Sequence, residues 1–150
     1  MSFTSLEQEN KYISNDSNVS VYLNNDYVQK IVGDYDMYFS NNTVNIGIFL
    51  YDDGEKADDI LNYQARYLLN TRDAVRKISS SNKKIKDRKI TTTVYRGTID
   101  NNENIYMLST ITSEKDKNYV IYIIEITLAE DYQENKDEME KIVEKISYNQ

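Results

Sequence analysis

The chain has 150 residues, a formal net charge of −7 at pH 7, and neither cysteine nor histidine. This length suits one domain that buries about 70% of the surface of its unfolded chain in a single core. The missing residue types exclude disulfides, thiolate zinc sites and nucleophiles that depend on cysteine or histidine. The negative charge disfavours nucleic acid and anionic lipid, and it favours a neutral or cationic partner.

The sequence predicts two parts. Residues 2–18 are polar and lack a sustained period, which is typical of an arm or tether (residues 1–18), and a single domain is expected over residues 19–150. No apolar run approaches the roughly 20 residues that a membrane-spanning helix needs.

The first half of the domain predicts strands followed by a helix. Residues 19–23 (VSVYL) alternate apolar and polar side chains, and residues 35–51 form a hairpin that turns at Asn41 and Asn42. From Glu55 to about Lys77 there is no glycine or proline, and apolar side chains recur at helical spacing. We expect one long helix there, ended by the polar run 79–82.

The second half predicts a meander and a closing helix. Strands 90–99 and 104–113 are expected to pair as a hairpin. The longest apolar run, YVIYIIEITL at 119–128, predicts a central strand with one face apolar throughout and the other apolar only as far as Ile123. Residues 131–148 carry one apolar stripe on a charged helix, which must lie on the sheet.

Short polar turns join neighbouring strands, so the fold class is α+β. The expected architecture is an antiparallel sheet of about six to seven strands with a long middle helix and a C-terminal helix packed on it. The order of elements over residues 19–148 resembles the PsbP-like fold, known from an extrinsic subunit of the photosynthetic oxygen-evolving complex and from small bacterial lipoproteins. The resemblance is carried by VSVYL, NIGIFLY, the helix after DDGEKADD, and YVIYIIEITL with its terminal helix.

The family often has a proline and a tryptophan after the first strand, where this chain has residues 24–27. The resemblance implies an α/β/α sandwich with a binding or assembly role, and it transfers no catalytic residue.

Two charged clusters are candidate sites. Asp52, Asp53 and Glu55 offer oxygen ligands for a metal ion, but acids before a helix also cap it and interact favourably with its dipole. The basic run Lys83, Lys84, Lys86 and Arg88 could dock an acidic or phosphate-bearing partner, or it could protect an edge strand from pairing.

The incompletely apolar face of the central strand suggests a binding groove. Glu125 and Thr127 would form its floor, and tyrosines on its rim would provide contact area for a peptide or sugar. The candidates for solvent-side positions are Tyr22, Tyr38, Tyr51 and Tyr95. The alternative is that this end of the sheet is simply solvated.

These features predict a non-enzymatic ligand- or protein-binding domain of a Gram-positive cell-surface lipoprotein. No cofactor is expected; the partner would be a protein, peptide or glycan, and a lipid anchor on the native N-terminus would place the domain outside the cytoplasm. The alternative is a cytoplasmic immunity or antitoxin-like protein that neutralises a basic partner.

Overall fold

The computed structural model describes residues 8–149. In this range the chain forms ten strands, two α-helices and one 3₁₀ turn, Ala129–Asp131. The helices are α1 (Ala57–Thr71) and α2 (Tyr132–Glu144). The strands are β1 (Glu9–Ile13), β2 (Val19–Asn24), β3 (Val28–Lys30), β4 (Met37–Ser40), β5 (Val44–Tyr51), β6 (Asp73–Ile85), β7 (Arg88–Ile99), β8 (Asn102–Ser113), β9 (Val120–Leu128) and β10 (Ser147–Tyr148).

Seven of these strands form one antiparallel sheet in the order β3-β4-β5-β9-β8-β7-β6. β9 lies between β5 and β8, which confirms that the YVIYIIEITL strand is central. The predicted hairpins β4–β5 and β7–β8 are also confirmed. The β7–β8 turn is Asp100-Asn101, and both residues have positive φ, as a two-residue primed turn requires. The structure therefore confirms the α+β class with an antiparallel sheet.

A second, smaller sheet has the order β1-β2-β10. The predicted VSVYL strand belongs to this sheet and not to the large one. Part of the segment expected to be a polar arm is a strand of this sheet. This strand, β1, pairs with Ser20–Asn24 along its whole length. Residues 1–7 of the expected arm lie outside the described residues. The end of the predicted terminal helix forms β10, which pairs with the start of β2.

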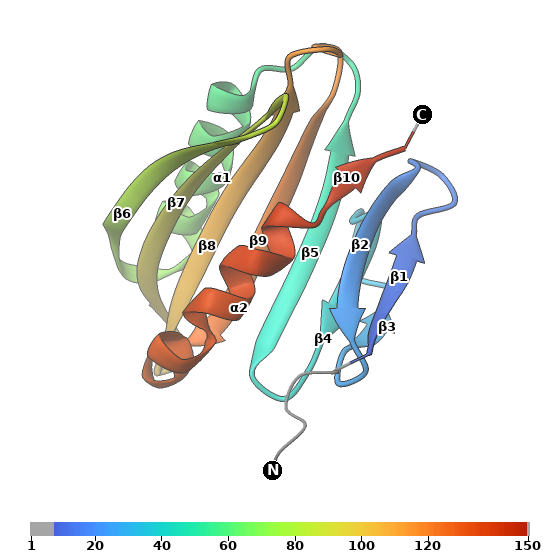
Figure 1. The fold of residues 1–150 in the computed structure, drawn as a ribbon. Coiled ribbons are helices and arrows are strands. Elements are labelled where there is room, and N and C mark those ends of the chain that lie inside the picture. Colours follow the sequence, from blue (N-terminus) through green and yellow to red (C-terminus); the bar gives the residue numbers. More distant parts are fainter. Residues whose placement is uncertain (1–7, 150) are drawn as a thin grey trace.

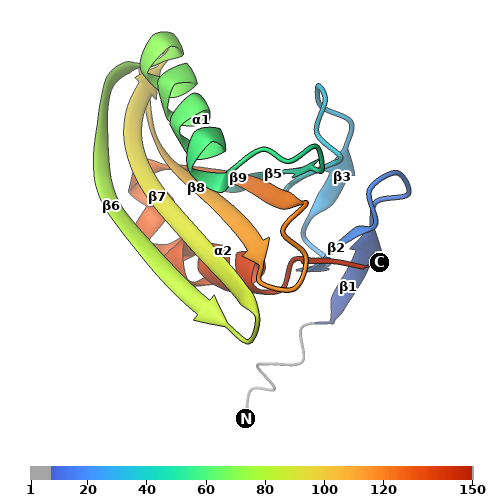
Figure 2. The ribbon, with the colours of Figure 1, turned by 90° about the horizontal axis from the view of Figure 1, so that it is seen from above.

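The helices lie on opposite faces of the large sheet (Figure 1 and Figure 2). α2 and the small sheet cover one face, where Val21, Phe39, Ile123 and Met139 share one buried cluster. α1 covers part of the other face, where Ile60 and Leu68 pack with side chains of β8 and β9. The two clusters sit on opposite sides of β9, because successive side chains of a strand alternate in direction.

The expected coverage of β9 is wrong. The face of Ile121 and Ile123 was predicted to be only partly covered, yet its last members, Glu125 and Thr127, are buried. The wholly apolar face is the more open one, since Ile126 is half-buried and Leu128 is exposed on it. A charged residue in a strand usually indicates a solvent-facing position. The sequence pattern therefore predicts exposure on the face of Glu125, which is the face that α2 covers.

The predicted helix to Lys77 is too long. α1 ends at Thr71, Arg72 is extended with φ −125°, and Ala74 has a left-handed φ of 52°. Residues 73–85 then form β6, which pairs with β7 through two irregularities in register. Helical spacing continues in the sequence, but pairing with a long neighbouring strand overrides this local preference.

Candidate binding surfaces

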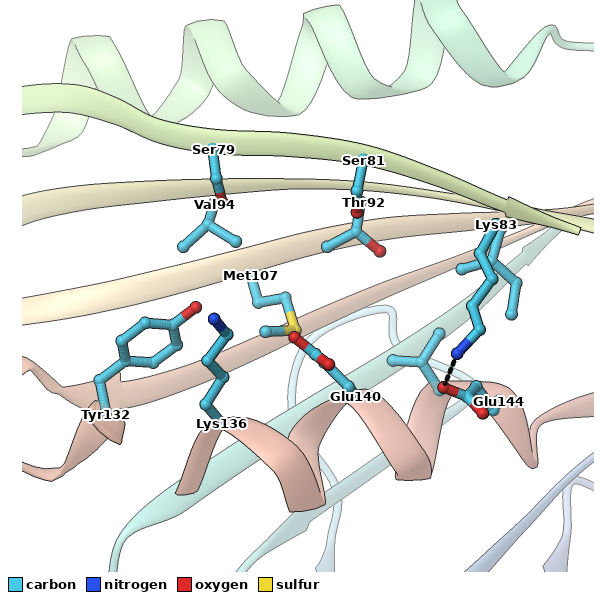
Figure 3. A pocket seen from close by; sticks show the side chains of 12 residues that line it. Ser79, Ser81, Lys83, Thr92, Val94, Met107, Tyr132, Lys136, Glu140 and Glu144 are labelled. Carbon is cyan, nitrogen blue, oxygen red and sulfur yellow. Dashed lines mark hydrogen bonds and ion pairs between the residues drawn. The ribbon is translucent and has the colours of Figure 1, made fainter. Parts of the chain in front are cut away.

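A groove of about 390 Å³ lies between β6 and α2 on the face of the large sheet that α2 covers (Figure 3). We call it the β6–α2 groove. Its floor consists of Ile90, Thr92 and Val94 of β7 and Met107 of β8. Its walls are mostly polar: Ser79, Ser81 and Lys83 come from β6, and Tyr132, Lys136, Glu140, Val143 and Glu144 come from α2. Such a surface offers hydroxyl groups and charges above a narrow, mostly apolar floor.

The groove walls carry four charged side chains, and two of them, Lys83 and Glu144, form an ion pair. Lys83 donates to Glu144 Oε2 at 2.8 Å, which joins β6 to α2 across one end of the groove. Figure 3 shows Lys136 and Glu140 projecting from α2 toward the sheet. Exposed ion pairs such as Lys83–Glu144 contribute little to stability because solvent screens them, so a ligand could displace this one at little cost.

β6 is the edge strand beside this groove. It is 13 residues long, and nearly all its side chains are exposed. Its register with β7 is unbroken from Ser79 to Ile85, whereas the irregularities lie before Ser79. Bulges and charges are the devices that keep edge strands from pairing with other chains. The half from Ser79 to Ile85 lacks the bulges, and its charges are confined to Lys83 and Lys84, so a partner strand could add there.

Most side chains of the predicted basic cluster have partners within the fold. Lys84 pairs with Glu114 at 2.5 Å, and Lys86 lies in the β6–β7 turn with a φ of 57°. Arg88 donates to two main-chain carbonyls at the end of α2, those of Ile146 at 2.6 Å and Glu144 at 2.8 Å. Three of the four predicted residues therefore have partners within the fold, and Arg88 acts as a clamp on the terminal helix.

Glu125 is inside the protein, with an exposed fraction of 0%. Neither of its carboxylate oxygens has a hydrogen-bond partner among the described residues. Burial raises the pKa of this carboxyl well above its ordinary value, and the negative charges of Glu138 and Glu140 on α2 raise it further. α2 thus closes over the predicted groove floor, and the prediction of an open groove at Glu125 is wrong.

Thr127 is buried beside it and has a structural role. Its hydroxyl donates to the Thr43 carbonyl at 2.8 Å and accepts from Asn135 Nδ2 at 3.1 Å. These contacts fasten the start of α2 to the end of β9 and to the β4–β5 turn.

The structure separates the tyrosines that were expected to share a rim. Tyr22 lies on β2 in the small sheet, with Lys11 Nζ 5.8 Å from its ring centroid. Tyr95 lies on β7 with the side chains of the α1 face. Tyr51 lies on the same face, where it joins Tyr35, Phe49 and Tyr122, and Tyr38 contacts Tyr35 with ring centroids 5.6 Å apart. Sequence periodicity finds Tyr38 and Tyr51, but it gives no reason to group them with Tyr122.

The acids before α1 do not cap it through a side chain. Lys56 occupies the N-cap position without a side-chain hydrogen bond, so the expectation that Asp53 or a neighbour caps the helix is wrong. Asp58 and Asp59 lie in the first turn, as expected from the helix dipole. Within residues 8–149, no group of three or more acidic side chains could hold a metal ion, and this includes Asp52, Asp53 and Glu55.

The architecture has counterparts among solved structures. Cyanobacterial PsbP (CyanoP) from Synechocystis superposes with a TM-score of 0.74 at 11% identity, covering 99% of this chain and 97% of that one. The chain has the PsbP-like fold. LpqN, involved in cell envelope biogenesis of Mycobacterium tuberculosis, has a TM-score of 0.64 at 11% identity, with 93% and 90% covered.

The Ran-binding protein Mog1p of Saccharomyces cerevisiae has a TM-score of 0.63 at 7% identity, with 94% and 95% covered. No protein-family model and no curated protein matches the sequence. The shared property is therefore the fold alone. Within the described residues, neither helix is long and apolar enough to cross a bilayer.

Proposed function

We propose that this PsbP-like domain is a non-enzymatic protein-binding module that accepts an extended segment of its partner along β6. The observation that carries the proposal is the coincidence of two features on one strand. The regular half of β6, Ser79–Ile85, is an exposed edge, and the side chains on one of its faces line the β6–α2 groove.

Strand addition uses main-chain hydrogen bonds for affinity and alternate side-chain positions for specificity. A partner strand beside β6 would direct every second side chain to the face of Ser79, Ser81 and Lys83. Those side chains would meet the hydroxyl groups and the charges of Lys136 and Glu140 at the rim of the groove. The groove volume of about 390 Å³ suits one or two side chains of a peptide.

The test begins with selection of binders from a displayed library of random twelve-residue peptides. We expect selected peptides to slow amide hydrogen exchange in Ser79–Ile85 of the wild-type domain. Replacing Ser81 by tryptophan fills the groove rim and should abolish binding. Ser80→Trp is the matched control, because the adjacent side chain points to the opposite face and does not line the groove.

Two results would refute this site. Selected peptides could leave the exchange of β6 amides unchanged, or they could bind the Ser81→Trp and Ser80→Trp variants equally well. Since the chain contains no other tryptophan, the fluorescence of each variant also reports whether the introduced side chain becomes buried on binding.

We further propose that the domain belongs to an extracytoplasmic lipoprotein of a Gram-positive bacterium, anchored through the chain before residue 8. Support comes from the polar composition of residues 2–18 and from the likeness of the fold to LpqN, a protein involved in cell envelope biogenesis. The native gene provides the test. An apolar segment and a lipobox cysteine upstream of Ser2 would support the anchor, whereas a native start at Met1 would refute it.

A second candidate is a cytoplasmic immunity or antitoxin-like protein, which the net charge of −7 favours because it would attract a basic partner. The likeness to Mog1p, a Ran-binding protein, also suits a protein partner. A toxin or secreted effector encoded beside this gene would favour this candidate over the lipoprotein.

A further inference from the structure

A second cavity, of about 300 Å³, lies on the α1 face of the large sheet. We call it the aromatic pocket. α1 packs against β8 and β6, and Figure 2 shows that it lies away from the β5 and β3 side of the sheet. Side chains from β5, β9, α1 and the β3–β4 loop line the cavity: Asp34, Tyr35, Phe49, Tyr51, Gln64 and Tyr122.

The pocket is held in place by the sheet. Phe49 lies directly opposite Tyr122 in the β5–β9 register, and the rings of Phe49 and Tyr51 meet edge to face with centroids 4.7 Å apart. The Tyr35 ring lies against Gly47, where an added Cβ would be only 2.8 Å from it. Glycine at this position therefore allows the ring to form one wall.

The loop that carries Tyr35 is also fixed. Asp36 donates its N–H to the Ile48 carbonyl at 2.9 Å and accepts from the Leu50 N–H through Oδ2 at 2.7 Å. The first bond continues the main-chain pairing between β4 and β5 by one residue, and the second ties the Asp36 side chain to β5. The wall on the Tyr35 side is thus positioned in advance of ligand binding, which lowers the entropy cost of binding.

The deepest side chain of the pocket carries an unpaired polar group. Tyr122 is 1% exposed, and its hydroxyl has no hydrogen-bond partner among the described residues. A buried hydroxyl without a partner is rare in folded proteins. Next to it, the Tyr51 hydroxyl accepts from Gln64 Nε2 at 3.4 Å, so the amide oxygen of Gln64 remains an acceptor for a ligand.

The electrostatics of the pocket favour a cation. The lining contains one carboxylate, Asp34, and among residues 8–149 no lysine or arginine lines it. Glu55 and Asp53 are near enough to Tyr51 for their charges to add to burial in raising its pKa. The faces of the aromatic rings carry negative electrostatic potential as well.

We propose that the aromatic pocket binds an arginine side chain of a basic partner protein. The planar guanidinium can stack on Tyr35 or Phe49 while its N–H groups donate to the Tyr122 hydroxyl and the Gln64 carbonyl. A quaternary ammonium has no N–H group, so it could not donate a hydrogen bond to the Tyr122 hydroxyl. The pocket lies on the opposite face of the sheet from the β6–α2 groove, so this inference does not depend on the function proposed for the groove.

The experiment is an NMR titration of the isotope-labelled domain with the amide of N-acetylarginine. Saturable shifts should appear at residues 34–36, at Phe49 and Tyr51, and at Gln64. The citrulline analogue has the same shape without the charge, and we expect it to bind about tenfold more weakly. Tyr122→Phe keeps the ring and removes the hydroxyl, which should weaken arginine binding about tenfold. Tyr95→Phe, on the same face but outside the pocket, is the matched control.

Equal affinity for arginine and citrulline would overturn the proposal, as would absence of saturable shifts at the pocket. Tetramethylammonium binding as tightly as arginine would also overturn it, because that ion cannot donate to Tyr122. Asp34→Asn serves as a second variant, because Asp34 lies on an exposed loop and its removal leaves the core intact. It should weaken arginine binding and leave the citrulline affinity unchanged; equal losses for both probes would count against a role for charge.

Discussion

Replacing Glu125 by glutamine should change how the stability of the domain depends on pH. The side chain is fully buried between the sheet and α2, and its oxygens have no partner among the described residues. Its pKa in the folded state is raised well above the ordinary 4.5, chiefly by burial and then by the charges of Glu138 and Glu140. The folded protein therefore keeps a proton that the unfolded chain releases.

The sign follows from proton linkage. Below about pH 4.5 both states bind the proton, and the free energy of unfolding from this group is at its maximum. Above that pH only the folded state binds it, so each further pH unit lowers the free energy of unfolding by about 1.4 kcal/mol until the folded-state pKa is passed. Between pH 5.5 and 7.5 the loss reaches up to about 2.7 kcal/mol, equivalent to roughly 5 to 10 °C in Tm for a domain of this size.

Glutamine keeps the shape of the side chain but has no proton to release. We therefore expect the stability of Glu125→Gln relative to wild type to rise with pH by up to about 2.7 kcal/mol over this interval. Urea unfolding followed by far-ultraviolet circular dichroism at pH 5.5, 6.5 and 7.5 measures the difference. Glu134→Gln removes one exposed charge from the same helix and is the control, for which the difference should stay flat. A flat difference for Glu125→Gln would refute the buried, protonated state of Glu125.

Arg88→Ala should lower the free energy of unfolding by about 2 to 3 kcal/mol, because it removes two charged hydrogen bonds to the end of α2. Arg88→Lys should restore only part of this loss, because one ammonium group cannot reproduce both hydrogen bonds of the planar guanidinium. Thermal unfolding measures the stability of both variants, and full recovery by lysine would contradict this role of Arg88. Ala74→Gly should raise stability by about 1 kcal/mol, because alanine is strained at a φ of 52°. Ala65→Gly in α1 should instead lower stability by about 1 kcal/mol, and a loss in both variants would show that the strain at Ala74 is absent.

The sequence by itself determined the elements whose signal is local. Alternation in the strands of both predicted hairpins, the apolar stripe of α2 and the length of the YVIYIIEITL run were enough to predict the α+β class, the central strand and the PsbP-like order. These features are local because strand and helix periods are properties of neighbouring side chains. The composition likewise excludes cysteine and histidine chemistry, because neither residue type occurs in the chain.

Only the tertiary structure decided which surfaces are open. Glu125 is a charged residue type in the sequence but is buried in the structure, because α2 crosses the end of β9 that local patterning predicts to be open. Residues 73–77 continue a helical pattern, yet pairing with β7 makes them part of an edge strand. Tyr35, Phe49 and Tyr122 are separated in sequence by up to 87 positions and meet only through the β5–β9 register and the loop before β4. Contacts between distant segments depend on strand order and helix placement, and neither is encoded in the period of any one segment.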